Sequence, residues 1–182
     1  MAASRYIAFL RAINVGGRTV PMARLRALFE DLGLDAVETF IASGNVLFET
    51  RAMSAATLEK RIETALLKAF GYEVSTFVRT RAEVAAIAAA RPFAAGAMAA
   101  ALALNVAFLR APLDARGVRT LGALRTPIDD FRATGSEVYW MCKKRQSESD
   151  FSNAVFEKAL GVRATFRGMN TVRRLAEKYP PR

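Results

Sequence analysis

The chain has 182 residues, 52% of them hydrophobic, which suits one ordinary domain or two small ones with a sizeable core. It carries 27 basic and 17 acidic side chains, and the resulting net charge of +10 attracts phosphates, nucleic acid and anionic membranes. Because it contains no histidine, the sequence excludes His-dependent nucleophile pairs and the commonest transition-metal ligand, and with them most hydrolase and zinc-enzyme functions.

Three features predict a cytoplasmic protein without a membrane partner. The single cysteine, Cys142, cannot form an internal disulfide, which fits a reducing compartment. The apolar run Tyr6–Leu10 is too short for the core of a signal peptide. The nearly uncharged stretch Phe93–Leu109 is interrupted by Gly96 and Asn105, so we interpret it as a linker that enters a buried strand, not as a membrane span.

Apolar periodicity and turn residues predict six elements and a trailing helix in the first half. The six are the strand 6–10, the helix opened by Pro21, the strands 36–42 and 46–49, the helix capped by Ser54 and ended by Gly71, and the strand 73–78. Thr80 and Glu83 then have the spacing of a capping box, in which each side chain bonds the other's backbone amide. The trailing helix that they begin ends before Pro92, because proline disfavours helix in the residue before it.

The second half predicts the same order of elements. Residues 106–111 (VAFLRA) repeat residues 7–12 (IAFLRA) almost letter for letter. The predicted elements are the strand 103–109, the helix 114–124, the strands 128–132 and 137–142 around the turn 133–135, the helix 149–160 ended by Gly161, the strand 163–166 and a last helix to Tyr179. The order and the repeated segment together indicate an internal duplication.

The order β-α-β-β-α-β in each half predicts the fold. It is the order of ferredoxin-like units, in which helices cover one face of an antiparallel sheet. We therefore predict an α+β protein of two tandem ferredoxin-like units. The first, with its trailing helix, spans residues 1–92, a linker spans 93–102, and the second, with the C-terminal helix, spans 103–182.

Residues 10–17 (LRAINVGG) resemble the domain of unknown function 1697 family, bacterial proteins whose first strand ends in LRGINVGG. Ala12 stands where the family usually has glycine, and Gly168 and Met169 stand where it usually has asparagine and tryptophan. If that asparagine and tryptophan line a site in the family, this chain has lost part of it. The resemblance implies a paired ferredoxin-like fold and brings no established activity. The likeness covers nearly the whole chain and continues through residues 20–22, 25–26, 41–46, 149–153, 165–167 and 170–171.

The loop after the first strand is the leading candidate for a binding site. Gly16 and Gly17 allow the backbone to turn its amides outward near Asn14, and Arg11 and Arg18 are suited to pair with a phosphate or carboxylate. The spacing is that of neither a Walker A nor a dinucleotide motif, so no cofactor is predicted. The alternative is that the glycines only permit a turn that needs positive φ.

Other polar residues have a structural and a functional interpretation. Ser43 and Asn45 are typical of a hairpin turn, and alternatively they face the first loop and bond the same ligand. Ser149 and Asn170 stand at predicted helix starts, where they would cap free amides. The same amides attract anions, and Arg167 lies just before one of these helix starts.

A basic cluster, Lys143–Arg145, follows the aromatic residues Tyr139 and Trp140 in the second half. Cations beside aromatic rings are the minimum expected of a nucleic-acid surface, but the sequence contains no RNP motif, so a solvated hairpin end is the favoured interpretation of the cluster. Cys142 is interpreted as a packed thiol, because no base is present to activate it. Adjacent acids such as Asp129 and Asp130 point to different faces and make a poor acid/base pair or metal cage.

We therefore predict a binding protein for a small anionic ligand, held at the Arg11–Arg18 loop between the two repeats with Arg167 and Asn170 contributing. One alternative is nucleic-acid binding through the basic second half. A second is an enzyme with Ser43 or Ser149 as nucleophile, for which no base is identifiable. A third is self-association through sheet edges. The sequence leaves the ligand, any reaction and the oligomeric state open.

Overall fold

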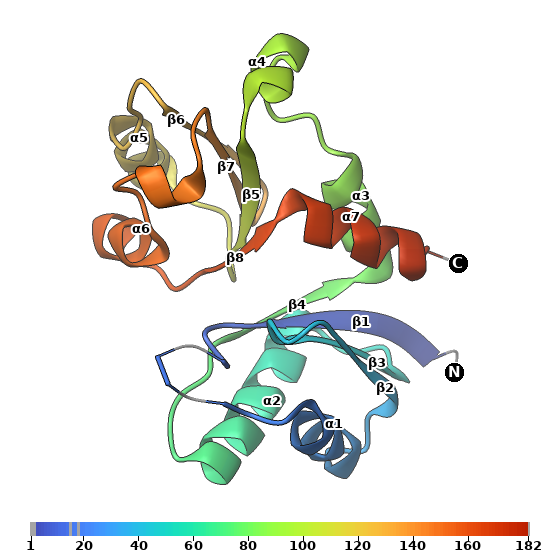
Figure 1. Ribbon diagram of the computed structural model, residues 1–182. Helices are drawn as coiled ribbons and strands as arrows, with labels where there is room; N and C mark the ends of the chain where they lie inside the picture. The colour runs from blue at the N-terminus through green and yellow to red at the C-terminus, as the bar shows by residue number, and fades with distance from the viewer. Residues whose placement is uncertain (1–2, 15, 18, 182) are drawn as a thin grey trace. The chain divides into compact units, whose positions relative to one another are not determined.

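The computed structural model describes residues 3–14, 16, 17 and 19–181 (Figure 1). Its chain divides into two compact units. Unit 1 comprises the residues up to Ala86 together with those from Leu175 onward, and unit 2 comprises Ile87–Arg174. Each unit contains one four-stranded antiparallel sheet, so the prediction of an α+β protein with two similar halves is confirmed.

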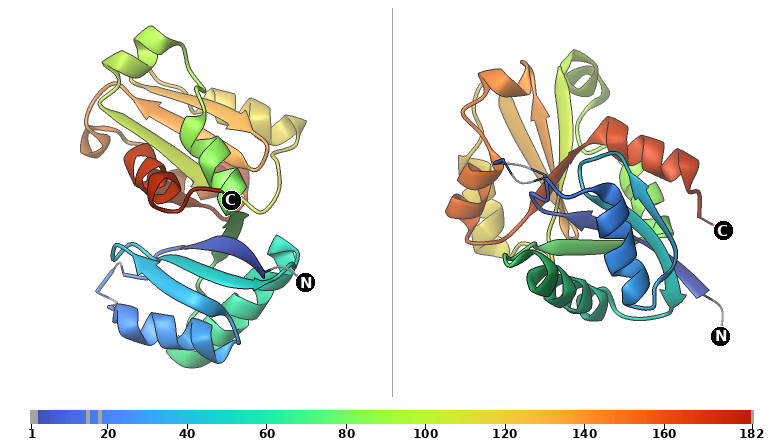
Figure 2. Two further views of the ribbon diagram at one scale, coloured as in Figure 1. Left: turned by 90° about the vertical axis from the view of Figure 1, so that its right-hand side faces the viewer. Right: turned by 60° about the horizontal axis from the view of Figure 1, so that its bottom comes forward.

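Unit 1 is a sheet with two helices on one face. Its strands are β1 (Ala3–Leu10), β2 (Asp35–Phe40), β3 (Asn45–Arg51) and β4 (Thr76–Thr80), in the order β2-β3-β1-β4. The helices α1 (Met22–Asp31) and α2 (Ala55–Phe70) lie side by side against that face (Figures 1 and 2). The chain runs from β1 through α1 to β2. The next strand, β3, lies between β1 and β2 and runs antiparallel to both.

The alternation of β1 explains where the unit 1 core lies. Tyr6, Ala8 and Leu10 belong to the cluster that packs under the helices, with Phe29 of α1 and Ile62 of α2. Alternate residues of a strand point to opposite faces, so the intervening residues of β1 lie on the other face of the sheet. The helix-facing cluster is continuous from strand to helix, which fixes the position of the loop that joins β1 to α1.

Capping residues set the helix ends where the sequence predicts them. Ser54 accepts a hydrogen bond from the Thr57 N–H, and Gly71 ends α2 in the left-handed conformation. The N–H of Thr80 donates to the Glu83 carboxylate at 2.7 Å, and the Glu83 N–H donates to the Thr80 hydroxyl at 3.2 Å. The predicted capping box is therefore confirmed, and it begins α3 (Arg81–Ala89).

Unit 2 repeats this arrangement with the strand order β6-β7-β5-β8. Trp140, Phe131 and Phe156 are central to its core, and α5 and α6 cover that face of the sheet (Figure 1). The elements are α4 (Ala95–Ala100), β5 (Ala103–Phe108), α5 (Ala115–Ala123), β6 (Asp129–Thr134), β7 (Glu137–Cys142), the 3₁₀ turn η1 (Gln146–Glu148), α6 (Asn153–Leu160), β8 (Thr165–Gly168) and α7 (Met169–Lys178).

The structure departs from the sequence prediction at several boundaries. The expected linker 93–102 contains the short helix α4, which six consecutive small or flexible residues form without a capping side chain. The helix expected from Ser149 begins at Asn153, because Ser152 is the residue whose hydroxyl accepts from the Val155 N–H. The compact units also differ from the predicted domains, since residues 87–92 lie in unit 2 and residues from Leu175 onward lie in unit 1.

Candidate functional site

The loop between β1 and α1 leaves the sheet through a constrained turn. The Arg11 N–H donates to the Ser75 carbonyl at 2.8 Å, and Ile13 is buried, so both sides of the turn are fixed. Ala12, which lies between them, has φ of +54°, in the region that favours glycine. Arg11, which follows β1, is half-buried, so its side chain lies at a defined point beside the loop.

Asn14 holds the loop in shape. Its Nδ2 donates to the Ala42 carbonyl at 2.9 Å, and its Oδ1 accepts from the Val20 N–H at 2.7 Å. Both ends of the amide are therefore engaged within the protein, and a ligand contact of Asn14 stays a prediction.

Gly16 and Gly17 form the open part of the loop. Both are exposed, with φ of +65° and +80°, and no atom of the described residues, chain neighbours aside, lies within 4 Å of the position that a Cβ would take at either residue. Their backbone is thus accessible to a ligand and adopts a conformation that side chains rarely allow. The predicted site residue Arg18 lies outside the described residues.

The hairpin turn between β2 and β3 lies against this loop. The Asn45 Nδ2 donates to the Phe40 carbonyl at 3.0 Å and to the Ser43 hydroxyl at 2.8 Å, so both residues help to shape the turn. The Gly44 carbonyl accepts from the Leu10 N–H at 2.8 Å, at the point where β1 ends. The turn therefore contacts Leu10 and Asn14 at the two ends of this segment, and a contact of Ser43 or Asn45 with a ligand stays a prediction.

The other three predicted site residues lie in unit 2. Ser149 caps no helix, since its hydroxyl donates to Asp129 and accepts from the Phe151 N–H. Arg167 is 8% exposed on β8 and donates to the Thr165 hydroxyl and the Phe166 carbonyl, at 2.8 and 2.9 Å. Its burial lowers the pKa of the Arg167 guanidinium to about 10.

Asn170, the third of these residues, is exposed in the first turn of α7. Its Oδ1 accepts from the Arg173 guanidinium at 3.3 Å. It therefore lies at the helix start where the sequence places it, and its side chain points to a cation of the same helix.

A buried carboxylate in unit 2 is the polar cluster that the sequence did not predict. Asp129 is 3% exposed and accepts from the Trp140 Nε1 at 2.8 Å and from the hydroxyls of Thr126 and Ser149, each at 2.9 Å. Burial opposes ionisation, but the hydrogen bonds of Trp140, Ser149, Thr126 and Cys142 together lower the pKa of Asp129 below its ordinary value. A carboxylate with a lowered pKa is a weak base, so the cluster does not supply the base that a Ser149 nucleophile needs.

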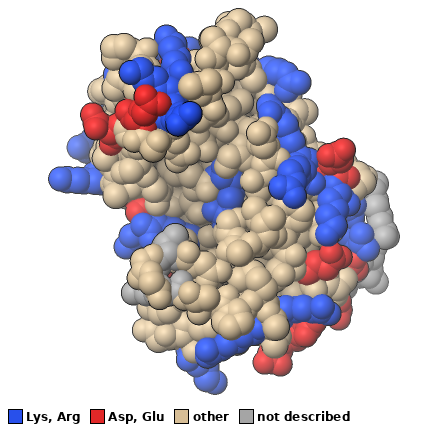
Figure 3. Space-filling model, in the orientation of Figure 1, with Lys and Arg blue, Asp and Glu red and all other residues tan. Residues whose placement is uncertain are grey.

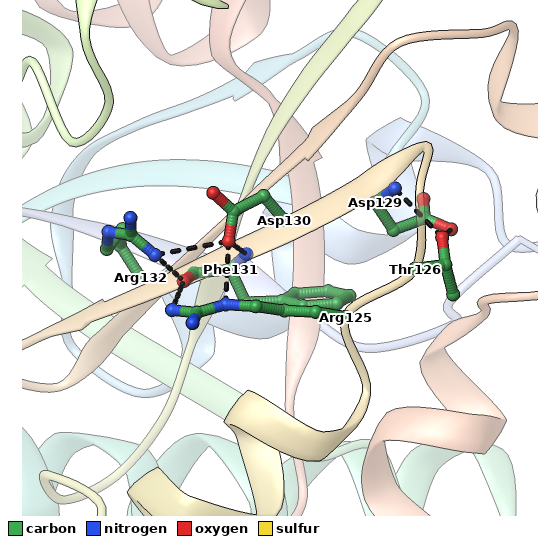
Figure 4. A network of polar contacts seen from close by, with 6 residues as sticks. All are labelled: Arg125, Thr126, Asp129, Asp130, Phe131 and Arg132. Carbon is green, nitrogen blue, oxygen red and sulfur yellow. Dashed lines mark hydrogen bonds and ion pairs between the residues drawn. The ribbon is translucent and has the colours of Figure 1, made fainter.

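The neighbouring acid has a different role. Asp130 Oδ1 lies 2.8 Å from the Arg125 Nε and accepts from Arg132 at 3.1 Å and from the Phe131 N–H at 2.8 Å (Figure 4). The two adjacent acids point to different sides of β6, as strand alternation predicts. Strand alternation could have assigned Asp129 and Trp140 to the same face of the sheet, but the strand pairing that brings them together required the structure.

The basic cluster of unit 2 is exposed, but its aromatic neighbours are not. Lys143, Lys144 and Arg145 are all exposed, whereas Trp140 and Tyr139 are 1% and 3% exposed. Neither ring is therefore available to stack on a base. Cys142 is fully buried, and burial raises the pKa of its thiol, so the interpretation as a packed thiol is confirmed.

An open groove of about 560 Å³ lies between the end of α1 and the exposed side of α2. It is lined by Leu32, Ala56, Thr57, Lys60, Arg61 and Thr64. The Arg61 side chain helps to stabilise the fold, because its guanidinium donates a hydrogen bond to the Leu32 carbonyl at 2.8 Å. Within the described part of the chain, no three potential metal ligands come together, and no helix is long and apolar enough to cross a membrane.

These features define a class of α+β protein, with two similar antiparallel units and an exposed glycine loop after the first strand. Residues 3–139 match the family model described as "Protein of unknown function (DUF1697)", and the chain belongs to this family. The match confirms the resemblance seen in residues 10–17, and it ends before the motifs at residues 149–171.

A solved structure shares the fold over its whole length. It is that of the conserved bacterial protein SP0830 from Streptococcus pneumoniae, with a TM-score of 0.77 and 24% sequence identity over 99% of this chain and 100% of that chain. No curated protein matches the chain.

Proposed function

We propose that the protein binds a small phosphate- or carboxylate-bearing anion at the glycine loop of unit 1. The observation that carries the proposal is the exposed backbone of Gly16 and Gly17, two successive left-handed residues with open space beside them. Successive backbone N–H groups in such turns form concave sites for anions. Arg11, at the end of β1, would add a charge-assisted hydrogen bond.

The surroundings of the loop favour binding because they fix its shape before a ligand arrives. Asn14 ties the loop to the Ala42 carbonyl and to the Val20 N–H, and Gly44 ties the hairpin turn to the end of β1. A loop that is already ordered loses little conformational entropy when it binds a ligand. In this proposal Asn14, Ser43 and Asn45 hold the loop in place.

For the remaining candidate residues, contact with the ligand stays a prediction. Arg18 belongs to the proposed site by its place in the sequence. Ser149, Arg167 and Asn170 belong to unit 2, and their contribution to the same ligand is a prediction from the sequence.

Strand order supports the finer fold assignment, which we propose for both units. In each, the first and second strands run in one direction with the third strand antiparallel between them, and the fourth lies beside the first. This is the arrangement expected of ferredoxin-like units.

The proposal is tested by thermal unfolding of the parent protein and of Arg11→Ala with added sodium phosphate, acetate or chloride at equal ionic strength. Binding to the folded state stabilises it, so phosphate or acetate should raise the Tm of the parent more than chloride does. Arg11→Ala should remove most of this rise. Arg26→Ala is the matched control, because it removes the same charge from an exposed position on α1.

Equal shifts with all three salts, or an unchanged rise in Arg11→Ala, would contradict the proposal. The backbone amide chemical shifts of Gly16 and Gly17 provide a direct readout, because an anion that binds elsewhere leaves these shifts unchanged.

Nucleic-acid binding is the second candidate, favoured by the three consecutive exposed cations Lys143–Arg145. Lys and Arg side chains form several groups on the face drawn in Figure 3, with uncharged surface between them. Since Tyr139 and Trp140 are buried, affinity would come from phosphate contacts alone. Binding of a short DNA or RNA should then fall steeply as salt is raised, and a weak salt dependence would exclude it.

A further inference from the structure

The groove between the end of α1 and α2 has no part in the site proposed above. Its volume of about 560 Å³ falls within the range of roughly 300–1,000 Å³ that is typical of small-molecule sites. Six described residues line it, whereas a stable protein partner engages about 20–30 residues on each side. The groove therefore has the dimensions of a site for a small molecule.

The residues of α2 that line the groove share one side of the helix. They lie three or four residues apart, the spacing of neighbours on a helix surface. They are Ala56, Thr57, Lys60, Arg61 and Thr64. Ile62 and Leu66 of the same helix belong to the core of unit 1. The amphipathic pattern of α2 thus buries one side of the helix and leaves the other open beside Leu32.

The charged residues of α2 are separated between its two sides. The carboxylates of Glu59 and Glu63 accept hydrogen bonds from backbone N–H groups of β4, at 2.9 and 2.8 Å. Lys60 and Arg61 line the groove instead. Among the described residues, no carboxylate lies within ion-pair distance of either cation. The positive charge of the groove is therefore not neutralised by the acids of its own helix.

Arg61 is held in place at the end of α1. Its guanidinium donates to the Leu32 carbonyl at 2.8 Å and lies 3.5 Å from the Met53 Sδ. The last carbonyls of a helix have no partner within the helix, so the first contact satisfies one of them. A guanidinium has five N–H donors, and these two contacts leave others for an anion. Arg61 is thus positioned before a ligand arrives.

The other polar side chains of the groove are already hydrogen-bonded. The Thr57 hydroxyl bonds the Ser54 hydroxyl at 2.8 Å, and the Thr64 hydroxyl donates to a backbone carbonyl one turn earlier, also at 2.8 Å. Leu32 and Ala56 add apolar surface. Two cations beside apolar and already bonded groups complement a ligand that combines one negative charge with an apolar body.

We propose that this groove binds a small organic carboxylate with an apolar body. The Lys60 ammonium and the Arg61 guanidinium donate to the carboxylate, whose two oxygens match the fork of an arginine. The apolar body lies along Leu32 and Ala56. The groove is at the C-terminal end of α1, whereas the glycine loop precedes the N-terminal end of that helix, so this proposal does not depend on the anion site of the loop.

A ¹⁵N NMR titration of the whole protein with sodium octanoate tests the proposal, with sodium chloride keeping the ionic strength constant. We expect saturable shifts of the backbone amides of Leu32 and of residues 56–64. Acetate lacks the apolar chain and 1-octanol lacks the charge, so each should bind at these residues about tenfold more weakly or less. Acetate or 1-octanol binding there as tightly as octanoate would overturn the proposal.

Lys60→Glu reverses one of the two charges at an exposed position, so the variant should fold. We expect its affinity for octanoate to fall about tenfold, the equivalent of one charge-assisted hydrogen bond. Lys68→Glu is the matched control, because it makes the same change at an exposed position in the last turn of α2. It should bind octanoate as the parent does, and equal affinities in the two variants would contradict the proposed site.

Two further outcomes would assign the groove or the ligand elsewhere. Shifts of amides 56–64 that depend on protein concentration without octanoate would give the groove to a second copy of the chain. Octanoate shifts confined to Gly16 and Gly17 would place the carboxylate at the glycine loop. Either result overturns the proposal. Arg11→Ala separates the two sites: if only the loop fails, amides 56–64 still respond to octanoate in the parent and in this variant.

Discussion

Ala12 is the residue at which a single substitution should stabilise the protein. Its φ of +54° places an alanine in a left-handed conformation, which costs an ordinary side chain roughly 1–2 kcal/mol. Ala12→Gly relieves this strain but increases the conformational entropy of the unfolded chain, so we expect a net gain of about 0.5–1 kcal/mol in the free energy of unfolding. Urea denaturation followed by circular dichroism measures it.

Ala65→Gly is the control for Ala12→Gly. Ala65 lies inside α2, where glycine lowers stability by about 1 kcal/mol. If both variants lose stability to the same degree, the strain assigned to Ala12 is absent.

Asp129 should make the stability of unit 2 depend on acid. Its pKa in the folded protein is below the ordinary value, so its contribution is fully present above the unfolded pKa of about 4 and is lost as the pH falls through the folded pKa. Asp129→Asn leaves buried donors of Trp140, Thr126 and Ser149 poorly matched, which should cost about 2–3 kcal/mol at pH 7. Denaturant unfolding from pH 2.5 to 7 measures both effects.

The difference in stability between the parent and Asp129→Asn should therefore shrink as the pH falls below 4. Asp130→Asn is the matched control, because it removes a part-exposed carboxylate from the same strand and should cost only about 0–1 kcal/mol. A difference that stays constant with pH would show that Asp129 is not ionised in the folded protein.

At the scale of elements, the hairpin turn of unit 1 should tolerate no side chain at Gly44. A Cβ there would lie 2.6 Å from the Ile13 Cγ2 and 3.1 Å from the Leu10 Cβ, and φ is +76°. Gly71, at the end of α2, has the same φ of +76° and nothing within 4 Å. Both alanine variants should lose about 1–2 kcal/mol from backbone strain, and Gly44→Ala should lose about 1–3 kcal/mol more from overpacking.

Thermal or urea unfolding of the two variants isolates the effect of close packing between the turn and the glycine loop. Equal losses in Gly44→Ala and Gly71→Ala would mean that the turn moves away from Ile13 at no cost.

The same elements show how far the sequence could predict the structure. Helix starts with local side-chain signals, such as Ser54 and the pair Thr80 and Glu83, were predictable because their hydrogen bonds join residues three apart. The Asp129 cluster was not, because its partners lie as far as 20 residues along the chain and meet only when β6, β7 and the segment before α6 pack. For the candidate site, the sequence located the glycine loop, while the internal bonds of Asn14 and Asn45 required the structure.

At the scale of the whole molecule, the C-terminal residues complete unit 1. The Tyr179 hydroxyl donates to Glu38 at 2.8 Å, its ring meets the edge of Phe40 at 6.4 Å, and its carbonyl accepts from the Arg81 Nε at 3.0 Å. Glu38 and Phe40 lie on β2, one of the two edge strands of the sheet, so Tyr179, 141 residues beyond Glu38, packs against side chains of this strand.

Tyr179→Ala should therefore weaken β2 selectively. We expect a loss of about 1 kcal/mol from the aromatic contact and a similar amount from the hydrogen bond. Amide hydrogen exchange should accelerate in β2 and remain unchanged in β6, the equivalent edge strand of unit 2. Tyr179→Phe keeps the ring contact with Phe40 and loses only the bond to Glu38, so it should show about half the effect. Because the carbonyl that Arg81 bonds belongs to the backbone, it persists in both variants, and the contrast measures the side chain alone. Faster exchange in both edge strands would mean instead that the C-terminal segment stabilises the molecule globally and has no specific role at β2.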